Sequence, residues 1–123
     1  MSREILFRAK RQYNGEWIYG DLQHNGKNIP KWVEGEEIIP ETVGQFTDLI
    51  DKNGTKIFEG DIVKVKTEYV DETVYLVAYR DCGFKLIYRP SNGVVNLTNN
   101  KSRYIEVIGN IHDQDIGENK QNG

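Results

Sequence analysis

Residues 61–88 read DIVKVKTEYVDETVYLVAYRDCGFKLIY and contain the clearest strand pattern in the chain. In residues 61–66 valines alternate with lysines, which is typical of a half-buried antiparallel strand. Residues 73–79 carry apolar side chains in both phases, so we expect a central strand that is covered on both faces. Residues 81–83 have the composition of a turn, and residues 84–88 alternate again. The stretch therefore predicts consecutive antiparallel strands.

Outward from this stretch, Asn-Gly pairs mark tight turns, because both residues tolerate the positive φ that short hairpins require. Residues 3–12 and 16–23 are expected to pair as a first hairpin, and residues 104–111 to form a last strand. A short helix or single turn is expected within residues 40–46, while residues 24–40 resemble a linker. The Asn-Gly pairs lie at residues 14–15, 25–26, 53–54 and 92–93.

Short, closely spaced strands joined by turns predict a mainly β fold, a small antiparallel barrel that is partly open and has little helix. The chain has 123 residues, which suits one domain and not two of ordinary size. We expect a single domain over residues 1–112 and a flexible tail over residues 113–123, where Ile116 is the last apolar residue.

Composition excludes several classes of protein. The net charge is −3, which does not suit a protein that coats a polyanion. No stretch approaches the ~18 apolar residues of a membrane span, and the start lacks the pattern of a secretory signal. Cys82 is the only cysteine and has no partner for an intramolecular disulfide. These features predict a protein of the cytoplasm.

The acidic middle of the chain offers three hypotheses for chemistry. Residues 49–60 resemble a calcium loop, but Leu and Gly stand at its first and last positions where carboxylates are needed. Glu59 and Asp61 could form an acid/base pair, or could join Asp48 and Asp51 around the metal of a hydrolase. The reading that we favour is structural, with one turn at Asp51 and a tight corner before the strand that begins at Asp61.

Three segments in the middle of the chain form a recognisable pattern: Glu41-Thr42-Val43-Gly44-Gln45-Phe46-Thr47, Asp51-Lys52-Asn53-Gly54 and Ile57-Phe58-Glu59-Gly60-Asp61-Ile62-Val63. Together they resemble the signature of YopX-type proteins, a family encoded largely by bacteriophages and prophages. Residues 3–9 are similar to the family's opening strand and residues 106–111 to its closing one. The chain departs from the pattern at Asp48 and after His112.

The resemblance implies a mainly β fold with an SH3-like barrel component, and it supplies no catalytic residues. We therefore expect a non-enzymatic protein without a cofactor or a metal ion. The motif residues are expected to have structural roles; they are Gly44, Gln45, Asp51, Gly54, Glu59, Gly60 and Asp61.

Catalytic and metal-binding motifs are otherwise weak. His24, His112 and Cys82 are too few and too far apart in the sequence to predict a zinc site. A lone cysteine after a strand is more often a small packing residue than a nucleophile. The glycine-rich phosphate-binding motifs GxxxxGK(S/T) and GxGxxG do not occur, so the sequence does not support nucleotide-dependent chemistry.

Two binding hypotheses remain. The leading one is an accessory protein of phage or prophage that contacts a protein of phage or host origin, with Trp17, Tyr19 and Trp32 as interface anchors and self-association as a possible part of its action. The alternative is a small β-barrel that binds nucleic acid through a late basic and aromatic patch. That patch comprises Lys85, Tyr88, Arg89, Arg103 and Tyr104. The reading that we favour for these residues is that they form ordinary solvated strand faces.

Overall fold

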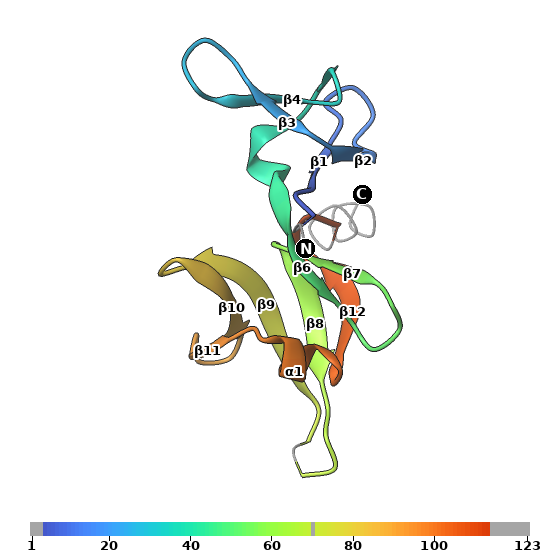
Figure 1. Ribbon diagram of the computed structural model, residues 1–123, viewed down its shortest axis with the longest axis vertical. Helices are drawn as coiled ribbons and strands as arrows, with labels where there is room; N and C mark the ends of the chain where they lie inside the picture. Colours follow the sequence, from blue (N-terminus) through green and yellow to red (C-terminus); the bar gives the residue numbers. More distant parts are fainter. Residues whose placement is uncertain (1–3, 70, 114–123) are drawn as a thin grey trace, which may run out of the picture. The chain divides into compact units, whose positions relative to one another are not determined.

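The computed structural model in Figure 1 describes residues 4–69 and 71–113. It contains two compact units, one that extends to Asp48 and one that begins at Leu49. Each unit has its own buried apolar cluster. The single domain expected over residues 1–112 stays a prediction, and residues 114–123 of the predicted tail lie outside the described residues.

The first unit opens with the predicted N-terminal hairpin. Strands β1 (Phe7–Lys10) and β2 (Trp17–Gly20) pair antiparallel, with Ala9 opposite Ile18. The start of β6 (Gly44–Ile50) pairs antiparallel with the other edge of β1. Because Ala9 and Ile18 face the same side, the hairpin directs one apolar face into the core of this unit.

A second, three-stranded sheet follows, and it corrects the expectation of a linker over residues 24–40. Strand β4 (Pro30–Val33) lies between β3 (Leu22–His24) and β5 (Glu36–Glu37), and all pairs are antiparallel. The linker prediction was wrong because these strands have only two to four residues, too few to show the alternation that reveals a strand in a sequence.

The expected short helix is present as the 3₁₀ turn η1 (Pro40–Thr42), and from Gly44 the chain is a strand instead. The turn is tied to the hairpin, because the backbone N–H of Lys10 donates to Thr42 Oγ1 at 2.8 Å. The buried cluster of this unit consists of Ala9, Ile18, Val33 and Ile38.

The second unit is built on a five-stranded antiparallel sheet with the order β11-β10-β9-β8-β12. The sheet confirms the strands predicted on both sides of the turn at residues 81–83, and β9 is its central strand. In Figure 1, β8, β9 and β10 run as neighbouring curved strands. The strands are β8 (Asp61–Val65), β9 (Thr73–Arg80), β10 (Gly83–Tyr88), β11 (Val94–Asn96) and β12 (Ile105–Asn110).

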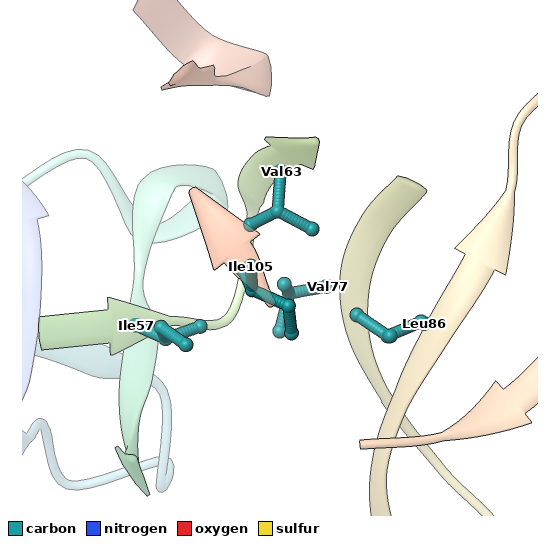
Figure 2. Packing of buried hydrophobic residues seen from close by; sticks show 5 residues of the cluster. All are labelled: Ile57, Val63, Val77, Leu86 and Ile105. Carbon is teal, nitrogen blue, oxygen red and sulfur yellow. The ribbon is translucent and has the colours of Figure 1, made fainter. Parts of the chain in front are cut away.

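The core of this unit collects one side chain from each of five strands, including β7 (Lys56–Phe58). Figure 2 shows these side chains directed into one shared space. A helix of one turn, α1 (Asn99–Ser102), connects β11 to β12, and the Thr98 hydroxyl caps it by accepting from the backbone N–H of Lys101 at 3.3 Å. The core residues are Ile57, Val63, Val77, Leu86 and Ile105.

The described chain is mainly β, its sheets are antiparallel and its helices are short, as the sequence predicts. Residues 4–69 and 71–113 contain no closed barrel. The helical segments described there have three and four residues, whereas a helix that crosses a membrane needs about 20.

Candidate functional site

The motif aspartate at the turn between β6 and β7 is a structural anchor. Asp51 is 5% exposed, and its Oδ1 accepts from the backbone N–H groups of Asn53 and Thr55 at 2.9 and 2.8 Å. Its Oδ2 accepts from the backbone N–H of Val107 on β12 at 2.9 Å. One carboxylate thus closes its own turn and holds that turn against a strand 56 residues later.

The second motif aspartate closes the corner that leads into β8. Asp61 is 1% exposed, and its Oδ2 accepts from the backbone N–H of Phe58 at 2.7 Å. Gly60 has φ +94° within this corner, its N–H donates to the carbonyl of Val77, and its carbonyl accepts from Ile111. Because a side chain is disfavoured at this φ, a glycine suits the position.

The remaining motif residues take ordinary backbone roles. Gly44 and Gln45 pair with β1 at the start of β6, and Gly54 has φ +85° in the turn that Asp51 closes. Glu59 is half-buried in the turn before β8 and is not part of a strand, in agreement with the tight corner that the sequence predicts there.

The carboxylates proposed for a metal hydrolase are not gathered. Asp48 is exposed on β6, whereas Asp51 and Asp61 are buried and accept hydrogen bonds from backbone N–H groups of different segments. Among residues 4–69 and 71–113, no three His, Cys, Asp or Glu side chains lie close enough together to hold a metal ion.

The histidines and the cysteine lie in separate places. His24 is exposed at the end of β3, and His112 is half-buried after β12. Cys82 is exposed in the turn between β9 and β10 with φ +63°, so the expectation of a packing residue was wrong. A turn that needs a positive φ brings this side chain to the surface, which its position after a strand does not reveal.

The N-terminal aromatic residues are divided between two sheets. Trp17 and Tyr19 share one face of β2, opposite Lys10 and Arg8 of β1. The Trp17 ring lies under both cations, 4.6 Å from Arg8 Cζ and 5.3 Å from Lys10 Nζ. The Trp17 ring therefore already contacts cations within the fold, whereas the Tyr19 side chain is 48% exposed.

Trp32 lies on β4 in the three-stranded sheet. The Nζ atom of Lys31, the preceding residue, is 5.2 Å from the centroid of the Trp32 ring. The proposed interface anchors thus occur as a pair on one sheet and a single residue on another.

The late basic and aromatic patch is also divided. Lys85 and Tyr88 are three residues apart on β10 and therefore point to opposite faces. Lys85 Nζ donates to Asn96 Oδ1 at 2.7 Å, whereas Tyr88 packs against Tyr75 with a centroid distance of 5.7 Å. The sequence interpretation of one continuous patch was wrong on this point, because it did not weigh the alternation of the strand. Arg89 and Arg103 are exposed, and Tyr104 is half exposed.

The structure reveals a hollow that the sequence interpretation missed. It has a volume of about 240 Å³ and an apolar lining. Its residues come from β8, β9, β10, β11 and the α1 region, so no local sequence signal marks it, and Tyr104 is its one member from the predicted patch. We call it the tyrosine pocket; its lining comprises Val65, Thr67, Thr73, Tyr75, Leu86, Val95, Lys101 and Tyr104.

The outer face of the sheet carries an ion-pair network instead. Lys64 on β8 has its Nζ 3.4 Å from carboxylate oxygens of both Glu106 and Glu72. The negative charge of Glu106, and next that of Glu72, raises the pKa of Lys64 above its ordinary 10.5. Lys52 also approaches Glu106, at 3.7 Å. These charges, half-buried at Lys64 and Glu106 and exposed at Lys52 and Glu72, suit a solvated strand face.

The geometry defines a small antiparallel β protein with buried turn carboxylates and an apolar hollow on its larger sheet. The chain matches the YopX protein family over residues 6–115 and belongs to that family. A similar solved structure is that of protein EF1440 from Enterococcus faecalis, with 27% sequence identity and a TM-score of 0.62. The match covers 93% of this chain and 97% of that one. No curated protein matches the chain.

Proposed function

We propose that this YopX family protein is a non-catalytic protein–protein interaction module, encoded by a phage or prophage and acting in the bacterial cytoplasm. The observation that carries the proposal is the tyrosine pocket, an apolar hollow in the larger sheet with half-exposed side chains at its border. Apolar and aromatic side chains that surround a preformed hollow are the usual anchors of protein interfaces.

The pocket is supported from below by the core. Leu86 is a core residue, and Val65 and Tyr75 pack against the same cluster while lining the hollow. At the border, Val95 is 42% exposed and Tyr104 is 47% exposed. A binding surface whose floor is fixed by core packing loses little conformational entropy when a partner docks.

The charge of this unit favours a protein partner over a nucleic acid. Residues 49–113 contain nine Lys or Arg and nine Asp or Glu, so the unit has no excess of cations. Nucleic-acid binding draws most of its affinity from neutralised phosphates. Because Lys85 faces away from Tyr88, these two residues of the predicted patch also do not line one groove.

The strand order supports the SH3-like, partly open barrel that the family resemblance implies. Four consecutive strands, β8 to β11, form a meander, and β12 returns to pair with β8 after the short helix α1. A fold alone assigns no function, so the proposal is based on the pocket and its border.

A second surface would serve self-association. Tyr19 is half exposed on β2, which is an edge strand of its sheet, and Trp32 is half-buried on β4. Light scattering of the full chain should show a concentration-dependent dimer that weakens in Tyr19→Ala and Trp32→Ala. A monomer at every concentration would contradict this part of the proposal.

The proposed function is tested by affinity capture of the tagged protein from phage-carrying host cells, with and without nuclease. We expect a stoichiometric, nuclease-resistant protein that Tyr104→Ala loses and the matched control Tyr13→Ala retains, because Tyr13 is exposed in the other unit. Bound material that disappears with nuclease, and whose affinity falls steeply with salt, would support the nucleic-acid alternative instead.

A further inference from the structure

We infer that the tyrosine pocket binds one apolar side chain of an extended partner segment, and that a carboxylate next to this side chain pairs with Lys101. The inference rests on the proposed function and adds the chemical class of the ligand. Its basis is the size of the pocket, the nature of its lining and the position of its charged residue.

The volume limits what the pocket can enclose. By itself the tyrosine pocket, at about 240 Å³, is smaller than the roughly 300–1,000 Å³ of pockets that surround a whole small-molecule ligand, whereas the hollow beside it lies within that range. The lining is mainly apolar, with Val65 and Leu86 from the core cluster and its apolar border, and Tyr75 and Val95 beside them. A single aliphatic or aromatic side chain fits this space, and its burial there releases water from apolar surface.

A neighbouring hollow gives room for the rest of an extended segment. It is wider, about 740 Å³, and is lined by residues 66–69 together with Tyr104. Thr67 and Tyr104 belong to both hollows, so the two adjoin at these side chains. A bound segment can therefore place its anchor in the tyrosine pocket and continue over the Tyr104 ring.

Lys101 determines the charge of the ligand, because it is the charged residue in the lining of the pocket. Its Nζ donates to the carbonyl oxygen of Asn96 at 2.8 Å, which holds the ammonium group at the border. An ammonium group has three donors, so this bond leaves two for a ligand. No ion pair of Lys101 occurs within residues 4–69 and 71–113. A carboxylate complements this site.

The probes are two sets of capped hexapeptides, added to the ¹⁵N-labelled full chain. In the first set the central residue is Leu, Ile, Phe or Trp and is followed by Glu; in the second, Lys replaces that Glu. We expect the Glu set to cause saturable shifts at the backbone amides of Thr73, Tyr75, Val95 and Tyr104. Replacement of the central residue by Ala should abolish them, because the apolar anchor is lost.

A charge reversal tests the role of Lys101. Lys101→Glu should bind the Lys set more tightly than the Glu set, by about fivefold, the upper range for an exposed ion pair. The matched control is Lys27→Glu, which changes the net charge equally at an exposed position of the first unit. That variant should keep the original preference. If Lys101→Glu does not fold, Lys101→Met should bind both sets equally.

Several results would overturn the inference: no binding of either set, shifts confined to other surfaces, or the original preference retained in Lys101→Glu. Saturable binding of an oligothymidylate at the same amides, without peptide binding, would also overturn it. The affinity capture separates this failure from that of the proposed function. If Tyr104→Ala loses a nuclease-resistant partner that wild type and Lys101→Glu both retain, the interaction module stands and the assignment of a carboxylate ligand to Lys101 fails.

Discussion

The two units bury their apolar side chains in different ways. In the first, most strands have two to four residues, and four apolar side chains form the buried cluster. The unit also buries Lys10 to 2% exposure beside the Trp17 ring. In the second, strands of up to eight residues direct five apolar side chains into one core, and two buried aspartates hold the connecting turns.

The larger sheet thus depends on long alternating strands, whereas the first unit depends on turns, short strand pairings and cation–aromatic contacts. A buried apolar residue of the second unit should accordingly be the most sensitive position in the chain.

Leu86→Ala should cause the largest loss of stability, about 2–5 kcal/mol, because it opens a cavity in the larger core. Val33→Ala, in the smaller cluster, removes fewer methyl groups and should cost about 1–2 kcal/mol. Urea unfolding measures both changes. Both tryptophans lie in the first unit, so their fluorescence reports on that unit, and hydrogen exchange of β9 amides reports on the second. A larger cost for Val33→Ala would reverse the comparison.

Asp51→Ala should lower the free energy of unfolding by about 3 kcal/mol, because three backbone N–H groups lose their acceptor. One of them, the N–H of Val107, is part-buried. Asp51→Asn should cost less, since its amide oxygen still accepts some of these bonds. Asp71→Ala, at an exposed position of the same unit, should change stability by less than about 0.5 kcal/mol and is the control. Equal midpoints for Asp51→Ala and Asp71→Ala in urea would show that the carboxylate is dispensable.

Two glycines with positive φ, one in each unit, allow a direct comparison. At Gly20, with φ +151°, an added methyl group would overlap the Glu34 side chain, which accepts from the N–H of Asp21. At Gly54, with φ +85°, the surrounding space is open. Gly54→Ala should therefore lower the free energy of unfolding only through backbone strain, by about 1 kcal/mol. Gly20→Ala should lower it by about 2 kcal/mol, because the Glu34 side chain must also move. Thermal unfolding of the two variants measures both losses of stability. A greater loss for Gly54→Ala than for Gly20→Ala would contradict the packing argument.

The smallest effect should come from the ion pairs of Lys64 with Glu106 and Glu72. Because these carboxylates raise the pKa of Lys64, its stabilising contribution is complete below the ordinary pKa of 10.5 and is lost as the pH rises through the raised value. Lys64→Met should be slightly less stable than wild type at neutral pH and low salt, and equally stable at pH values above the raised pKa. Lys27→Met is the control. A difference that persists in high salt and at high pH would assign the effect to packing of the lysine stem.

Much of the second unit could be predicted from local pattern. Alternation placed β8, β9 and β10, and apolar side chains in both phases of β9 identified the central strand. The three-stranded sheet of the first unit was not predicted, because its strands are too short to show an alternating pattern. The late basic and aromatic patch was misjudged for a different reason: nearness in sequence does not place Lys85 and Tyr88 on one face of a strand.

The class of fold, the family, most of the strand boundaries in the larger sheet and the positions of the tight turns can be predicted from the amino-acid sequence. These features depend on local preferences for turn residues and on the period of the strand. The hydrogen bond from Val107 to Asp51 and the hollow bordered by Val65, Tyr75, Val95 and Lys101 arise only in the folded chain. Such contacts join residues tens of positions apart, and pairing between distant strands is set by the packing of the whole sheet rather than by any local pattern.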